Sequence, residues 1–145
     1  MVGVSEFEVF VFGLGDQEMA FDVEYVSMVI EKTDITPVPR SKRNVLGVMN
    51  LRGRIVPVID LSSMLGLSST NITEGKIVVV NLEDLEVGFL VERVKGVVRV
   101  KNEDVEKMQK FDSFGERSKG IIKRGEELIV HLNLQKILED LTASS

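Results

Sequence analysis

Short runs of β-branched and aromatic residues, broken by turn residues, dominate this chain and predict a mainly β fold. A hairpin is expected over residues 45–60, because Arg52-Gly53 divides two apolar runs and glycine accepts the positive φ of a tight turn. A second hairpin is expected across Arg124-Gly125. Further strands are predicted over residues 7–12, 18–23, 76–81, 87–91, 94–100, 120–122 and 128–132.

Helices have a minor part in the pattern. Apolar residues three and four positions apart predict an amphipathic helix at the end of the chain, at Leu134, Ile137, Leu138 and Leu141. Another short helix is expected from Leu61 to Leu65, and a helical turn at Val26, Val29 and Ile30 before an extended piece. Residues 101–115 are polar, and we expect an irregular segment there. Pro57 lacks an N–H group and is therefore expected at a sheet edge or a bulge.

The sequence also repeats itself. Residues 20–26 match residues 88–94, and residues 55–65 match residues 128–138, in the same order and at nearly equal separations. The repeat predicts two similar small β-barrels, which bury sheet edges that would otherwise invite aggregation. We place them at roughly residues 15–85 and 86–132, with the N-terminal strand and the C-terminal helix added. Barrels this small should share a core, with a groove between them for a partner.

The composition excludes several classes of protein. A net charge of −5 and a pI of about 5.0 argue against a nucleic-acid binder, because neutralising phosphates requires surplus Lys and Arg. The chain has no cysteine, which excludes disulfides and thiolate metal sites and suits a reducing cytoplasm. No apolar run approaches the ~20 residues that a membrane-spanning helix needs, and no signal peptide is recognised. A cytoplasmic protein without direct membrane insertion is therefore expected.

Residues that could carry catalysis are scarce. The chain has a single histidine, His131, in an apolar strand without carboxylates nearby in the sequence, so we expect a structural role for it. Nucleophilic catalysis would need a Ser or Cys beside a positioned base, and no such pattern occurs. The glycine pair Gly13 and Gly15 is followed by Glu18, so the dinucleotide-binding pattern fails. We predict no enzymatic activity, no metal and no cofactor.

The most distinctive segment covers residues 47–61, GVMNLRGRIVPVIDL. It closely resembles the signature G-V-x-N-L-R-G-x-I-V-P-V-x-D-L of the CheW family, the bacterial chemotaxis coupling proteins. Residues 21–39 and 87–97 resemble the first-half and second-half patterns of that family, and residues 120–138 resemble its C-terminal hairpin and helix. The resemblance extends from about Glu6 to Thr142.

This resemblance implies a single CheW-like domain over residues 1–145, folded as two small five-stranded β-barrels around a shared interior. It implies an adaptor that binds the cytoplasmic tips of chemoreceptors and the regulatory domain of the histidine kinase CheA. That kinase domain is similar in fold, so the two proteins can alternate in rings at receptor arrays beneath the inner membrane. The adaptor itself is expected to be monomeric when alone.

Candidate protein-binding residues lie on the first hairpin. Arg52 at its tip could make forked hydrogen bonds to a carboxylate or to carbonyl groups, and we rank it first. Asn50 and Gly53 should shape the turn. The alternative is that Arg52 is an ordinary solvated arginine of a turn and has no role in binding.

A second group of candidates is apolar. Val26, Met28 and Ile30 would point to one side of an extended strand and could form a strip that receives a receptor helix. The alternative is that these three residues are part of the core and have no role in binding. Val97 and Val98 are weaker candidates for the opposite wall. Some relatives, as we align them, carry an acidic residue at the position of Met28, which puts a charge-based contact there in doubt.

Two alternative functions remain open. One is a CheW-like scaffold of a non-chemotaxis two-component pathway; a CheV-type protein would carry an added receiver domain, and the chain ends soon after its last helix. The other is a β-barrel that binds oligonucleotides or oligosaccharides. That reading requires aromatic stacking platforms, and the chain has no Trp and one Tyr.

Overall fold

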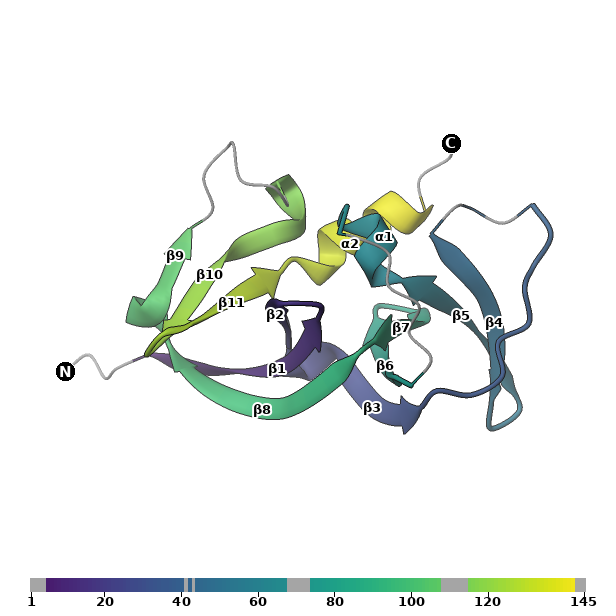
Figure 1. The fold of residues 1–145 in the computed structure, drawn as a ribbon, viewed down its shortest axis with the longest axis horizontal. Helices are drawn as coiled ribbons and strands as arrows, with labels where there is room; N and C mark the ends of the chain where they lie inside the picture. The colour runs from purple at the N-terminus through teal and green to yellow at the C-terminus, as the bar shows by residue number, and fades with distance from the viewer. Residues whose placement is uncertain (1–4, 41, 43, 68–73, 108–114, 143–145) are drawn as a thin grey trace. The chain divides into compact units, whose positions relative to one another are not determined.

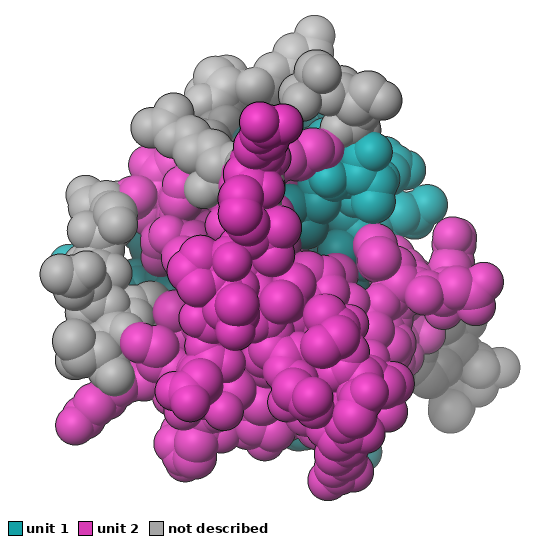
Figure 2. Space-filling view, turned by 90° about the vertical axis from the view of Figure 1, so that its right-hand side faces the viewer, with its two compact units in different colours: residues 1–23, 95–145 teal, residues 24–94 magenta. Residues whose placement is uncertain are grey.

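The computed structural model describes residues 5–40, 42, 44–67, 74–107 and 115–142 (Figure 1). Strands predominate and form two sheets, one with six strands and one with five. The chain divides into two compact units, residues 1–23 with 95–145 (unit 1) and residues 24–94 (unit 2), which Figure 2 distinguishes by colour. The prediction of a mainly β fold is confirmed.

The sheet of unit 1 combines the two ends of the chain. Its order is β8 (Arg93–Lys101), β1 (Glu6–Leu14), β2 (Gln17–Asp22), β11 (Glu127–Leu132), β10 (Ser118–Arg124) and β9 (Val105–Lys107). The β1–β2 and β10–β11 hairpins are antiparallel, and the parallel pairing of β2 with β11 joins them.

The sheet of unit 2 is built from the middle of the chain. Its order is β3 (Val26–Glu31), β6 (Lys76–Leu82), β7 (Leu85–Val91), β5 (Arg54–Asp60) and β4 (Val45–Leu51). Here the parallel pairing of β5 with β7 joins the hairpins β4–β5 and β6–β7. The five strands correspond in order to β8, β1, β2, β11 and β10 of unit 1, which matches the repeat in the sequence.

The units do not coincide with the predicted repeats, roughly residues 15–85 and 86–132. β3 follows β2 in the chain but pairs in the other sheet, and β8 follows β7 in the same way. Each repeat therefore contributes one strand to the other sheet, a long-range exchange that local patterns do not reveal. The boundaries fall instead after residues 23 and 94.

Two expectations about the sheets require correction. Unit 1 has six strands rather than five, because β9 forms within the segment expected to be irregular. Within the described residues, each sheet also keeps two edge strands, so neither closes into a barrel. The edge strand β8 is protected by outward charges, since its burial alternates and its exposed positions are Arg93, Lys95, Val97, Arg99 and Lys101.

Each sheet has its own apolar cluster. In unit 1 the cluster consists of Val9, Val11, Ala20, Val100, Ile122 and Ile129. In unit 2 it consists of Met49, Leu51, Val56, Val58, Ile77, Val79 and Leu90. Both clusters take alternate residues from their strands, as expected for one buried face of a sheet.

Pro57 lies inside the sheet rather than at an edge, since β5 has a neighbour on each side. Its partner across the hairpin is Val48, whose N–H and C=O groups are bonded to Thr36 on the other side. The Val48–Pro57 pair is therefore one that exchanges no ladder hydrogen bonds. The parallel ladder with β7 begins only at Val58, so no bond in either described ladder requires a proline N–H.

Short helices end the hairpins as predicted. Helix α1 (Leu61–Met64) follows β5, and the Asp60 side chain caps it by accepting a hydrogen bond from the Ser63 N–H at 3.3 Å. Helix α2 (Leu134–Thr142) follows β11 and buries Leu134, Ile137 and Leu138. The helical turn expected around Val26 is instead the 3-10 turn η1 (Val23–Tyr25), with two more 3-10 turns at η2 (Asn102–Asp104) and η3 (Gly115–Arg117).

The added strand β9 provides a test of close packing. A Cβ atom on Gly120 would lie 2.2 Å from the backbone oxygen of Glu106, so Gly120→Ala should displace β9 from β10. We expect the free energy of unfolding to fall by about 1–3 kcal/mol, measured by urea denaturation. Lys123→Ala, which removes an exposed ion pair to Glu106, is the matched control and should have little effect. Equal stability of the two variants would contradict the packing.

Candidate protein-docking site

The tip of the β4–β5 hairpin has a well-defined backbone. Arg52 has a φ of 53° and Gly53 a φ of 85°, as in the two-residue type I′ turns that suit the twist of antiparallel strands. The side-chain oxygen of Asn50 accepts a hydrogen bond from the Gly53 N–H at 2.9 Å. The turn predicted at Arg52-Gly53 is confirmed.

The two arginines of this tip differ in their surroundings. Arg52 is exposed, and among the described residues its guanidinium has no hydrogen bond or ion pair. Arg54 donates two hydrogen bonds to Glu86 on β7, from Nε to Oε1 at 3.0 Å and from a terminal nitrogen to Oε2 at 2.9 Å. The hydrogen bond to Glu86, with its charge, raises the pKa of Arg54 above the ordinary value.

An exposed apolar side chain completes the tip. Ile55 is 66% exposed and lies opposite Asn50 across the hairpin. We define the docking tip as Asn50, Arg52, Gly53, Arg54 and Ile55. Sequence reasoning missed Ile55 because an isoleucine in an apolar strand is normally counted as core, and its only local signal is its position beside the turn.

The apolar strip expected on β3 is divided by a β-bulge. Val26 pairs with Val80, whereas Met28 pairs with Val79 and Ile30 with Ile77. Adjacent residues of a strand face opposite sides of a sheet, so Val26 does not share a face with Met28. Met28 and Ile30 are half-buried against the apolar cluster of unit 2. The prediction that all three residues point to one side is therefore wrong.

Val97 and Val98 are also separated by alternation. Val97 is 58% exposed on the outer face of β8, whereas Val98 packs against the apolar cluster of unit 1. Of these two residues, only Val97 is exposed.

His131 has a carboxylate beside it that the sequence did not reveal. Its Nε2 lies 2.5 Å from Oδ1 of Asp22, and the Lys119 ammonium donates to the other carboxylate oxygen at 2.6 Å. The Phe7 ring stacks on the imidazole with centroids 5.4 Å apart. Burial alone would raise the pKa of Asp22, but His131 and Lys119 together outweigh it, so the pKa lies below the ordinary value. We call this group the Asp22 cluster; it links four strands of unit 1 and is structural, and its members are Phe7, Asp22, Lys119 and His131.

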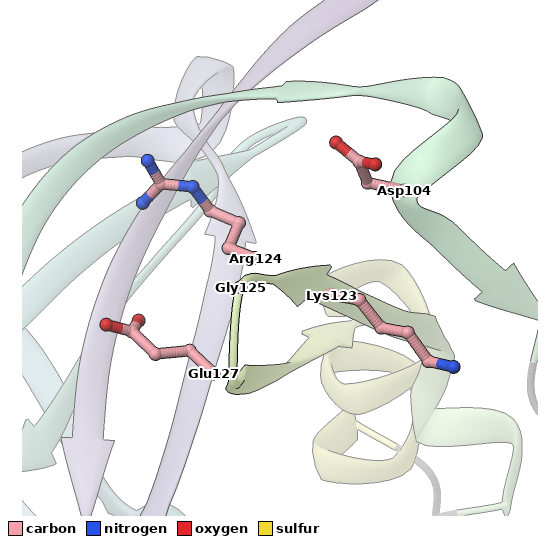
Figure 3. Close-up of a pocket in the computed structure, with 5 residues that line it drawn as sticks. All are labelled: Asp104, Lys123, Arg124, Gly125 and Glu127. Carbon is pink, nitrogen blue, oxygen red and sulfur yellow. The ribbon is translucent and has the colours of Figure 1, made fainter.

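A pocket of about 440 Å³ beside the β10–β11 turn does not resemble a binding site for a small molecule. Figure 3 shows that the Lys123 side chain points away from those of Arg124 and Glu127, so the charged groups do not converge. Lys123 pairs with Glu106, and Glu127 pairs with Lys95. Among the described residues, no group of His, Asp or Glu side chains could hold a metal ion.

The Asp22 cluster predicts a pH dependence of stability. Because folding lowers the Asp22 pKa, its contribution is complete above the unfolded value near 3.8 and is lost as the pH falls through the folded pKa. Asp22→Asn should lower the free energy of unfolding by about 1–2 kcal/mol at neutral pH. In urea denaturation from pH 7 to pH 3, this difference from the wild type should shrink towards acid. A constant difference over that range would contradict the assignment.

Comparisons with known proteins agree on one family. The model of the CheW-like domain matches residues 8–142. The chemotaxis protein CheW of Thermotoga maritima is 47% identical over 96% of this chain and 92% of its own length. The chemotaxis protein CheW of Rhizobium meliloti is 33% identical over 77% of this chain and 72% of its own.

A solved structure shows the same fold. The scaffolding protein TtCheW of Thermoanaerobacter tengcongensis superimposes with a TM-score of 0.83, covering 89% of this chain and 90% of its own, at 24% identity. In the described part of this chain, no helix has the length and apolar character needed to cross a membrane. The chain belongs to the CheW family of chemotaxis proteins.

Proposed function

We propose that this protein is a non-enzymatic adaptor of bacterial chemotaxis that couples chemoreceptors to the histidine kinase CheA. Family membership supports the pathway. The observation that carries the site is an exposed arginine on a structurally defined hairpin, Arg52, on a tip that also exposes Ile55. Arginine is one of the residue types enriched among the few that dominate a protein interface, and the Arg52 guanidinium has no partner among the described residues.

The adaptor binds the regulatory domain of CheA and the cytoplasmic tips of the receptors. It works in the cytoplasm, at receptor arrays beneath the inner membrane, and needs no cofactor. Each contact is expected to be of standard size, about 800 Å² per partner. At rest the protein is a monomer, and assembly depends on these partners.

The residues of the docking tip have different roles in this proposal. Arg52 contacts a carboxylate or carbonyl groups of the partner through its planar guanidinium. Asn50 and Gly53 act indirectly, because their hydrogen bond holds the turn that presents Arg52.

The apolar candidates divide according to their exposure. Of the two valines on β8, Val97 is exposed and can contact a partner. Val98 packs against the apolar cluster of unit 1 and supports the strand. Met28 and Ile30 shape the edge strand β3 through their packing, and Val26 occupies the other face at the bulge.

Arg52→Ala should weaken binding to the CheA regulatory domain or to a receptor-tip fragment by about 2 kcal/mol. The free energy of unfolding should change little, because the Arg52 side chain has no partner among the described residues. Calorimetry with each partner and urea denaturation measure the two quantities. Arg52→Asn is a sharper variant, because Asn-Gly is a preferred sequence for this turn and the guanidinium is removed.

Arg40→Ala is the matched control. Arg40 is also an exposed arginine of unit 2 with a positive φ, 63°, but it lies outside the docking tip. Unchanged binding of both partners by Arg52→Ala and Arg52→Asn would exclude this tip as the docking site. Absence of binding by the wild-type protein would reject the proposed function itself.

A further inference from the structure

The ion pair between Arg54 and Glu86 ties the docking tip to strand β7. The parallel ladder of β5 and β7 covers Val58–Asp60 against Gly88–Leu90. Arg54 begins β5 beyond the end of that ladder, and its two hydrogen bonds to Glu86 bridge the same two strands there. The free end of the hairpin is thus held to its neighbour by two side chains.

The same ion pair changes the charge that the tip presents. Both arginines are exposed, with the Arg54 side chain 53% exposed and that of Glu86 21% exposed. The carboxylate of Glu86 uses both of its oxygens on Arg54. The charge of Arg54 is therefore compensated by Glu86, whereas Arg52 has no ion pair among the described residues.

We propose that Glu86 is a positioning and specificity-determining residue of the docking tip. It leaves Arg52 as the one cation of the tip without an ion pair among the described residues, on a tip that also exposes Ile55. The complementary partner surface then carries one carboxylate next to an apolar pocket, rather than an extended acidic patch. This inference rests on the proposed function and names the chemistry of the partner at that site.

Electrostatics explain why this arrangement matters for specificity. Charges at the rim of an interface mainly alter the association rate and its salt dependence. A second unpaired arginine would attract acidic surfaces of many proteins, so neutralising Arg54 discriminates against them. The contact that Ile55 makes with a partner depends on how well the two surfaces fit, and not on charge. An exposed ion pair adds little to folding stability, so its cost or benefit should be visible in binding.

The test uses the full chain. Its partner is the CheA regulatory domain or the receptor-tip fragment, whichever binds Arg52→Asn more weakly than it binds the wild type. Glu86→Gln removes the negative charge and one of the two acceptor oxygens that face Arg54, without changing the shape of the side chain. We expect this variant to bind about threefold more weakly at high salt, where charge is screened and the loosened tip remains. Its association rate should rise at low salt, giving a steeper salt dependence than the wild type.

The double variant Arg54→Glu with Glu86→Arg rebuilds the ion pair with its ends exchanged. If the pair acts by positioning, this variant should recover at least half of the lost affinity and the wild-type salt dependence. Ile55→Ser should lower the affinity about tenfold with unchanged salt dependence. Glu31→Gln is the control, because it also removes one carboxylate from an ion pair of unit 2. Its partner Lys76 lies at the opposite end of the β6–β7 ladder from Glu86.

The outcomes separate the inference from the proposed function. If Glu86→Gln matches the wild type in affinity and salt dependence, or if the exchanged pair restores neither, the role of Glu86 is overturned. If Ile55→Ser binds normally, the apolar part of the partner surface is overturned. If the wild-type protein binds neither partner, the proposed function fails, and that result is distinct because it precedes any variant.

Discussion

The parallel pairing of strands far apart in the sequence is the constraint on which both sheets depend. In unit 1, β2 pairs with β11, and in unit 2, β5 pairs with β7. Antiparallel hairpins form between neighbouring segments, but a parallel pair requires a long connection. Each of these pairs joins two hairpins into one sheet and buries one face of both. Without them the hairpins would be isolated ribbons, which are marginally stable in water.

The docking tip inherits its geometry from this arrangement. The β4–β5 hairpin projects past the end of the parallel ladder with β7, so its turn is exposed while its strands remain held. The left-handed backbone of Arg52 and Gly53, with the hydrogen bond from Gly53 to Asn50, leaves the turn few alternative conformations. The backbone of a residue on such a turn loses little conformational freedom on association, which favours affinity.

The Asp22 cluster has a different physical role. It brings a carboxylate, an imidazole and an ammonium together at the end of β2, on the parallel pair that joins the two hairpins of unit 1. Removing a carboxylate from water is costly unless it is paired and hydrogen-bonded, and both oxygens of the half-buried Asp22 have partners. The contacts of the single histidine with Asp22 and Phe7 therefore support the fold of unit 1.

The sequence by itself determined the local features of this protein. Short runs of β-branched and aromatic residues predicted most strands. Arg52-Gly53 and Arg124-Gly125 located two of the hairpins, and the N-L-R-G segment indicated the family and made Arg52 a candidate for binding. These features depend on residues close together in the chain, so their periodicity and turn chemistry are readable without the fold.

Tertiary structure alone decided which distant groups meet. Asp22 and His131 are 109 residues apart, and Arg54 and Glu86 are 32 apart. The bulge that separates Val26 from Met28, and the exchange of β3 and β8 between the sheets, also depend on long-range register. Strand pairing sets these contacts, and many registers are compatible with the same alternating pattern until both strands and their buried faces are specified.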